Sequence, residues 1–279
     1  MFVKMALVIV KVVLVNRVCN NLLKRSQSKK NVSAQKVRST LAKNFFLILS
    51  ILVLSTTNIA NADRRGYVWT YEYITMPKGR SEVEYYLTHK VTDFGNYNNK
   101  NSWEHQIELE YGLTDKWDVS IYQRWKQSNT SSEDKFQYTG TKLKTRYRIG
   151  EKGMYPLDTL LYFEYIRPDS SKEPEILEGK LILAKDFGKY NFAYNQILKV
   201  GINNRGGNEN EYACGLNYEF NPRLKVGLES TGNYTEDKYY LGPTVSWANE
   251  NFWVGLGAQR GLNDRSDDLK FRLIIGFPF

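Results

Sequence analysis

The chain contains few cysteines, prolines and histidines, and no long apolar run. Its 279 residues include 2 Cys, 7 Pro and 2 His, and the mean hydropathy is −0.51. Because a membrane-spanning helix needs about 20 consecutive apolar residues, this composition argues against a helical membrane protein. Cys214 is the only cysteine beyond residue 62, so no intramolecular disulfide can form there. The 20 Tyr and an aromatic content of 14% argue against disorder.

Acidic residues are absent from the first 62 positions, which hold ten basic residues. The whole chain has 39 Lys and Arg against 30 Asp and Glu. Residues 63–279 therefore hold 29 basic and 30 acidic residues, a net charge of −1. Because the positive excess lies in the N-terminal segment alone, it gives no support to nucleic-acid binding, and we predict no nucleic-acid partner.

Residues 1–62 have the layout of a secretory leader. Its parts are a basic region with Lys36, Arg38 and Lys43, an apolar core over Phe45–Leu54, and the small-residue motif Ala60-Asn61-Ala62. This pattern predicts a signal peptide that is cleaved before Asp63. Residues 1–37 fit less well, and we interpret them as an over-extended gene start. The alternative is a long basic region that belongs to the leader.

From residue 81 onward, apolar and polar residues alternate with period 2, which is typical of strands. In Ser102–Leu113, five of six residues in one phase are apolar, and the other phase holds none of these large apolar residues. The pattern predicts twelve strands: Glu82–Thr92, Ser102–Leu113, Trp117–Lys126, Phe136–Ile149, Thr159–Arg167, Ile176–Lys185, Tyr190–Val200, Glu211–Phe220, Leu224–Thr231, Tyr239–Trp247, Phe252–Gln259 and Leu269–Phe279. Lengths of about 8–12 residues suit tilted transmembrane strands. We predict an all-β, antiparallel transmembrane β-barrel of about 12 strands over residues 81–279.

The connections between these strands alternate between short turns and longer polar loops, as in outer-membrane barrels. An even strand number then places both ends of the barrel on the periplasmic side. Tyr67, Trp69, Tyr71 and Tyr73 also alternate, but a thirteenth strand would break this parity. We therefore interpret residues 63–80 as a periplasmic or lumen-lining arm that ends in a turn.

The last strand carries the most specific motif. Leu269, Phe271, Leu273, Ile275, Phe277 and Phe279 share one phase, and Phe279 is the final residue. This resembles the C-terminal assembly signal of bacterial outer-membrane β-barrels, although Pro278 departs from the commonest pattern. The resemblance implies recognition by the barrel-assembly machinery and localisation in the bacterial outer membrane. There the partners would be outer-membrane lipid and lipopolysaccharide.

A second resemblance rests on two short stretches. Pro77-Lys78-Gly79 and the segment Glu178–Asn195 are similar to outer-membrane transporters grouped with the phenol-degradation MetA-like family. The resemblance implies a transporter class and names no solute.

The two phases of the strands predict two faces. We expect the apolar phase to contact lipid and the polar phase to face the lumen, because a charge near the membrane midplane costs about 2–4 kcal/mol. The candidate solute path is lined by Glu104, Glu108, Glu110, Arg124, Lys142, Lys144, Arg146 and Arg148. These charges could pair across strands and fill the interior, or they could form acidic and basic walls that orient a polar solute. A barrel of twelve strands is intermediate in size between filled barrels and open porins, so the strand number does not decide between these two interiors.

The sequence lacks a recognisable catalytic or metal-binding motif. His89 and His105 fall in the lipid-facing phase, and a hairpin symmetric about Tyr97 would place them opposite each other. Two ligands without a third do not make a zinc site. We predict no catalytic residue, metal or cofactor, and a narrow passive channel or transporter for small polar or amphiphilic solutes. The alternatives are an outer-membrane hydrolase acting on lipid or peptide, and a non-conducting structural or adhesive barrel.

Overall fold

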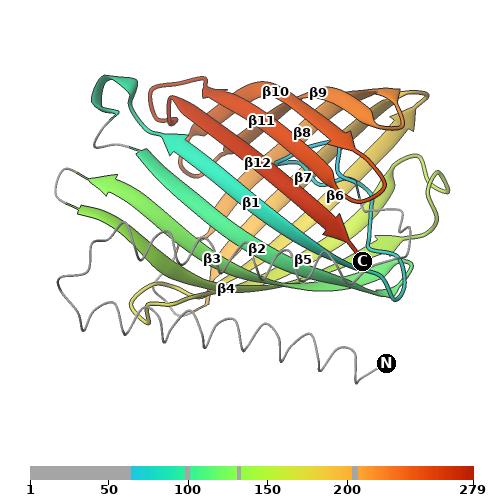
Figure 1. The fold of residues 1–279 in the computed structure, drawn as a ribbon, viewed down its shortest axis with the longest axis horizontal. Helices are drawn as coiled ribbons and strands as arrows, with labels where there is room; N and C mark the ends of the chain where they lie inside the picture. The colour runs from blue at the N-terminus through green and yellow to red at the C-terminus, as the bar shows by residue number, and fades with distance from the viewer. Residues whose placement is uncertain (1–63, 98–100, 131–132, 203–206) are drawn as a thin grey trace. The chain divides into compact units, whose positions relative to one another are not determined.

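A computed structural model describes residues 64–97, 101–130, 133–202 and 207–279, and these form a β-barrel (Figure 1). The strands are β1 (Ser81–Val91), β2 (Asn101–Thr114), β3 (Trp117–Thr130), β4 (Glu133–Ile149), β5 (Asp158–Pro168), β6 (Ile176–Phe187), β7 (Tyr190–Gly201), β8 (Glu209–Asn221), β9 (Leu224–Asn233), β10 (Lys238–Ala248), β11 (Trp253–Gly261) and β12 (Leu269–Pro278). A short 3-10 helix, η1 (Phe94–Asn96), follows β1. In the described part of the chain, no helix has the length and apolarity needed to cross a membrane. The predicted leader lies outside the described residues and stays a prediction.

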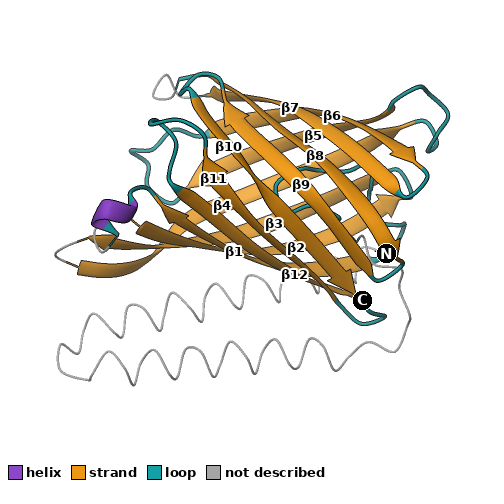
Figure 2. Cartoon of the chain, turned by 90° about the horizontal axis from the view of Figure 1, so that it is seen from above, coloured by secondary structure: helices purple, strands orange, loops and turns teal. Residues whose placement is uncertain are grey.

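The sheet is closed. Each strand pairs antiparallel with its sequence neighbours, and β1 pairs with β12, so the order runs around a complete barrel. Leu87 lies opposite Leu273, and Val83 lies opposite Phe277. The first and last strands are joined further by two backbone hydrogen bonds between Ser81 and Phe279, of 2.8 and 3.1 Å. The predicted twelve-stranded antiparallel barrel is confirmed, and Figure 2 shows its tilted strands.

The connections follow the predicted alternation except at β4, whose hairpin with β3 closes in two residues and whose connection to β5 spans residues 150–157. Two-residue turns such as Asp115-Lys116 and Gly188-Lys189 lie at the end that holds the chain terminus, here called the short-turn end. Longer connections, such as residues 169–175 and 262–268, lie at the other end, here called the long-loop end. Antiparallel strands of a barrel produce this arrangement, because successive connections must fall at opposite ends.

The hairpin of β3 and β4 is longer than predicted. We expected a loop over 127–135, whereas the ladder continues to the pair formed by Thr130 and Glu133. This extension is polar in both phases, so the apolar alternation that marks a strand is missing from it. The register also shifts between Arg124 and Trp125, opposite Gly140, whose φ is 132°. Such a bulge bends the strand locally.

The exterior of the barrel is apolar. Large outward-facing side chains are more than one third exposed on successive strands: Leu143, Phe163, Leu181, Leu198, Leu216 and Leu228. An apolar surface that continues around a barrel is suited to hydrocarbon and would be an aggregation hazard in water. Much of the inward phase is polar, and many of its polar residues are buried, among them Glu84, Thr88 and Glu108. Where the arm packs, the inward residues include apolar ones such as Leu160 and Ile182. The predicted division of the two faces is therefore present.

Residues 64–77, here called the arm, lie within the barrel rather than in its sheet (Figure 1, cyan). Tyr67 and Val68 are 0% exposed. Near its end the arm makes a turn in which Arg80 N–H donates to Pro77 O at 3.0 Å, and Gly79 has a φ of 75°. The chain then enters β1 at the short-turn end.

A closed ladder resists detergent, because opening it in an apolar environment leaves backbone groups without partners. We expect the folded protein to migrate faster in an unheated denaturing gel than after boiling. Identical migration of the two samples would contradict a closed transmembrane barrel.

Candidate functional site in the barrel interior

One carboxylate of the barrel wall binds the backbone of the arm. Glu229, on β9, is 0% exposed and accepts hydrogen bonds from three successive backbone amides of the arm. The distances are 2.8 Å from Val68, 2.9 Å from Trp69 and 2.8 Å from Thr70. Hydrogen bonds to an ionised acceptor are stronger than neutral ones. Glu229 therefore satisfies amides that no strand can satisfy there.

Other wall side chains also form hydrogen bonds with the backbone of the arm, as a neighbouring strand would. Asn195 on β7 accepts from Tyr71 N–H at 2.6 Å and donates to Tyr71 O at 2.9 Å. Asp118 on β3 accepts from Met76 N–H at 2.9 Å, and the Ser246 hydroxyl donates to Arg65 O at 2.6 Å. The arm is thus bonded to several sides of the barrel without joining the sheet. This explains why its alternating aromatics do not form a strand.

Glycines in the wall make room for the arm. A Cβ built on Gly257 would lie 2.6 Å from the Trp69 ring, and one on Gly255 would lie 3.0 Å from Val68 Cγ1. The ring of Tyr67 occupies the space beside Gly215 in the same way. Any larger residue at Gly215 or Gly257 would push the arm away.

The short-turn half of the interior is filled by a buried charge network. Lys144 lies 2.5 Å from Glu108 and 2.9 Å from Glu110. Arg146 pairs with Glu110 and, at 2.7 Å, with Asp118. All five side chains are at most 3% exposed. These side chains pair with one another inside the protein and do not meet an open water-filled path.

The network continues into the arm through an aromatic ring. The Tyr71 ring has the Arg65 guanidinium carbon at 4.3 Å and the Lys180 ammonium at 4.6 Å from its centroid. Lys144 lies 5.7 Å from the same centroid. Cations at these distances are attracted to the face of the ring. The arm and the charged wall therefore form one packed unit.

The eight predicted lumen residues divide into groups. Glu108, Glu110, Lys144 and Arg146 belong to the buried network. Glu104, Arg124 and Lys142 lie nearer the long-loop end and are partly exposed. Arg148 lies near the short-turn end, where it donates to Asp115 O and its guanidinium carbon lies 5.4 Å from the centroid of the Tyr73 ring.

In the short-turn half, the acidic and basic strands do not form separate walls. Only β3 separates β2 from β4, and its inward-facing Ser120 is small. The long side chain of Lys144 reaches across β3 to the acids of β2. Cross-strand pairing is therefore the correct interpretation for this half of the interior.

The two histidines lie on the exterior but not opposite each other, so that prediction was wrong. His89 pairs with Trp103 in the register, and His105 pairs with Leu87, because the β1–β2 ladder is centred on residue 96, one residue before the assumed centre at Tyr97. His89 stacks on Trp103, with ring centroids 4.0 Å apart. The Nδ1 atom of His105 is 2.7 Å from the Tyr85 hydroxyl. In the described residues no group of three or more His, Cys, Asp or Glu could hold a metal ion.

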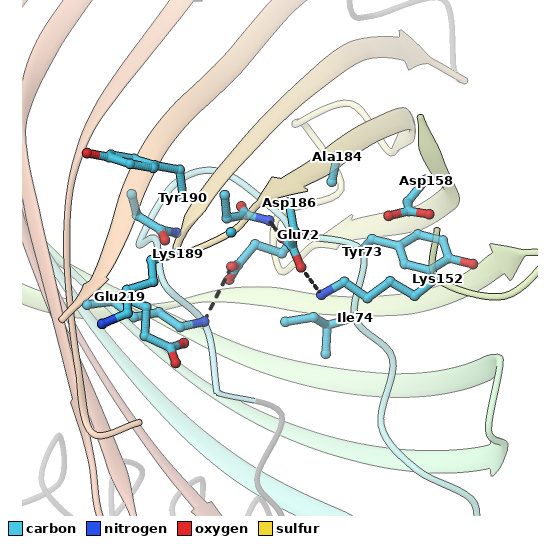
Figure 3. Close-up of a pocket in the computed structure, with 14 residues that line it drawn as sticks. Glu72, Tyr73, Ile74, Lys152, Asp158, Ala184, Asp186, Lys189, Tyr190 and Glu219 are labelled. Carbon is cyan, nitrogen blue, oxygen red and sulfur yellow. Dashed lines mark hydrogen bonds and ion pairs between the residues drawn. The ribbon is translucent and has the colours of Figure 1, made fainter. Parts of the chain in front are cut away.

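A cavity of about 280 Å³ lies at the short-turn end, between the arm and the wall (Figure 3). The arm contributes Glu72, Tyr73 and Ile74, and the turns and strands from β4 to β9 supply the other sides. Two ion pairs cross it: Lys152 with Asp186 at 2.6 Å, and Lys225 with Glu72 at 3.8 Å. Sequence reasoning missed this cavity, because its lining residues come from segments far apart in the chain.

Solved structures similar to this chain are outer-membrane β-barrels. The KdgM porin is 11% identical with a TM-score of 0.52, and the match covers 71% of this chain and 99% of that one. The KdgM porin in complex with disordered oligogalacturonate matches with a TM-score of 0.51, 11% identity and the same coverage. The Acinetobacter baumannii outer membrane protein Omp33 follows at 12% identity, 72% and 99% coverage and a TM-score of 0.46.

The shared feature is the fold: this chain is an outer-membrane-type β-barrel. The predicted localisation in the bacterial outer membrane agrees with that fold and with the apolar exterior. No protein-family model matches the sequence. A search of curated proteins also found no match.

The buried network predicts a large stability effect. The substitution Lys144→Met leaves Glu108 and Glu110 without one of their cations, and breaking a buried pair this way costs about 3–5 kcal/mol. We expect the free energy of unfolding to fall by that amount in urea titrations of the protein in lipid vesicles, followed by tryptophan fluorescence.

Lys152→Met is the matched control, because Lys152 pairs with Asp186 at an exposed site. Its loss should cost at most about 1 kcal/mol. Equal losses for the two variants would show that the Lys144 network does not hold the interior together.

Proposed function

We propose that the protein is an outer-membrane channel for small polar or amphiphilic solutes, and that the arm closes its short-turn half. The observation that carries the proposal is the contrast between the two halves of the interior. Charged side chains near the long-loop end are partly exposed, as in the pairs Lys90–Glu104 (36% and 22%) and Lys199–Glu211 (22% and 21%). The arm residues that fill the other half, such as Thr70 and Met76, are at most 1% exposed.

The attachment of the arm is compatible with movement. Its backbone bonds to the wall run through side chains such as Glu229 and Asn195, so its departure breaks no hydrogen bond of the sheet. Each such bond contributes about 1 kcal/mol net, and those to charged groups about 1.5–3 kcal/mol. Exchangeable side-chain contacts, rather than a sheet ladder, therefore hold the closed state.

The wall behind the arm supports a narrow path. Gly215, Gly255 and Gly257 face the arm, so its departure would leave a space lined by backbone and small side chains. Twelve strands enclose less space than the 16–18 strands of open porins. Both features favour solutes of small cross-section. One of the similar structures holds the KdgM porin with disordered oligogalacturonate; at 11% identity that solute is not transferred to this chain.

The contacts of His105 do not favour the hydrolase alternative. Its ring faces outward, lies against the Tyr85 hydroxyl and packs edge-on against Phe136. A serine-hydrolase arrangement would need this histidine beside a serine and a carboxylate. The filled half of the interior favours the non-conducting alternative, which the experiment below separates from a channel.

A reversible cross-link tests whether the arm closes the channel. We expect V68C/G255C, in a C214S background, to form a disulfide, because a Cβ on Gly255 lies 3.0 Å from the Val68 Cγ1 position that the new sulfur takes. In planar bilayers the oxidised protein should pass no current, and reduction should restore the current of the uncross-linked protein.

The single variants V68C and G255C in the same background are the controls, and their current should not respond to oxidation. Equal currents from the oxidised and reduced double variant would exclude the arm as the gate. No current from any folded sample would exclude the channel and leave the non-conducting barrel.

We also propose that β12 carries the signal read by the barrel-assembly machinery. Phe271, Leu273, Ile275, Phe277 and Phe279 lie in its outward phase, opposite the polar inward residues Lys270 and Arg272. A row of apolar side chains on the strand that closes the barrel gives the machinery a surface to bind. Outside the barrel, the apolar exterior would contact outer-membrane lipid and lipopolysaccharide. The similarity to the MetA-like family remains a hypothesis about class.

The assembly proposal predicts a loss of folded protein in the membrane. We expect F277S/F279S to reduce the heat-modifiable fraction in outer-membrane preparations severalfold, since it removes two apolar contacts from the end of β12. L241S/L256S changes two outward residues of β10 and β11 and serves as the control. An equal reduction in the two variants would show a general packing effect rather than recognition of β12.

A further inference from the structure

Basic side chains gather on one side of the long-loop half, on β12, β1 and β3. Lys90 lies opposite Lys270 in the β1–β12 register, and Arg272 lies opposite Thr88 two residues further along. On β3, Arg124 faces the same interior, opposite Gln106 of β2. The acid among them is Glu104, opposite Thr88. We call Lys90, Arg124, Lys270 and Arg272 the basic cluster.

The cluster is only partly neutralised by the protein. Lys90 pairs with Glu104 at 3.2 Å. Lys270 donates to the Thr231 hydroxyl at 3.0 Å, and its ammonium lies 3.3 Å from the centroid of the Tyr240 ring. Arg272 donates to the Thr88 hydroxyl at 2.9 Å and to Val68 O at 3.1 Å. These partners are neutral, and no described carboxylate forms an ion pair with Arg124, Lys270 or Arg272.

Three other described interior cations of this half have acidic partners. Lys142 lies 2.8 Å from Glu164, Lys180 lies 2.9 Å from Glu178, and Lys199 lies 2.8 Å from Glu211. The excess of positive charge is therefore confined to one side of the lumen, where four cations surround one carboxylate. Local net charge of one sign between low-dielectric walls concentrates counter-ions of the other sign.

We propose that the basic cluster is a binding site for multivalent soluble anions, such as carboxylates or phosphates, and that these are the solutes the channel admits. This inference rests on the proposed channel function. A multivalent anion would replace the missing acidic partners and could accept charge-assisted hydrogen bonds from Arg124, Lys270 and Arg272. Lipopolysaccharide phosphates lie outside the barrel, so an inward-facing cluster takes its anion from solution.

The basic cluster also contacts the arm. Arg272 donates to the Val68 carbonyl of the arm, whose amide is bound by Glu229. Its guanidinium carbon lies 5.6 Å from the centroid of the Trp69 ring. An anion that draws the guanidinium toward the lumen competes with these contacts, so anion binding at this site would loosen the arm.

The test is calorimetric titration of the folded protein with citrate in a zwitterionic detergent at low salt. R124Q/K270Q should bind citrate at least tenfold more weakly than the parent protein, because it removes two of the four cations. The matched control K172Q/R265Q removes one lysine and one arginine from exposed loops at the same end, and it should bind as the parent does. Glycerol, an uncharged polyol, should give no binding heat.

A second measurement separates this inference from the channel function. In an asymmetric KCl gradient, the reversal potential of the parent protein should show anion preference, and R124Q/K270Q should lose it. Citrate binding without any current would overturn the channel and leave the anion site standing. Current with no citrate binding, or equal binding by all three proteins, would overturn the anion site alone. If R124Q/K270Q shows no heat-modifiable migration and so has not folded, the single variant R124Q is used instead, because it keeps Lys270 and its contacts.

Discussion

The hydrogen-bonded closure of β1 on β12 is the constraint on which the other features depend. In hydrocarbon every backbone group of a spanning sheet must find its partner within the sheet, so the ladder has to return to its first strand. Closure gives every strand one face toward lipid and one toward an enclosed interior. The charges of the inward phase then have to be compensated, either by water or by each other.

The interior meets this requirement in two different ways. Near the short turns the chain fills its own lumen: the arm supplies apolar rings and backbone amides, while Lys144 and Arg146 compensate the acids around them. Near the long loops the charges stay in contact with water, and one side keeps an excess of positive charge around Arg124 and Lys270. A filled half joined to a hydrated half suggests a closed channel whose entrance selects by charge.

Glu229 shows how one buried residue connects these halves. Its carboxylate binds three amides of the arm, and the carbonyl of Val68 in the same stretch accepts from Arg272 of the basic cluster. In the proposed channel, these hydrogen bonds would couple the position of the arm to anion binding at the entrance. Coupling of this kind requires both elements to share contacts, and here they share Val68.

The sequence by itself determined the strands, their number and their two faces, because period-2 alternation in long segments is a local property that a barrel imposes on each strand. It also indicated that Tyr67 to Tyr73 lie outside the sheet, through the parity of the connections. Only the tertiary structure decided which charges pair, since Lys144 reaches acids more than 30 positions away along the chain. The tertiary structure also decided where the arm binds, on Glu229, Gly255 and Gly257. These positions come together only when the barrel closes, and periodicity along the chain does not show which side chains face each other across a lumen.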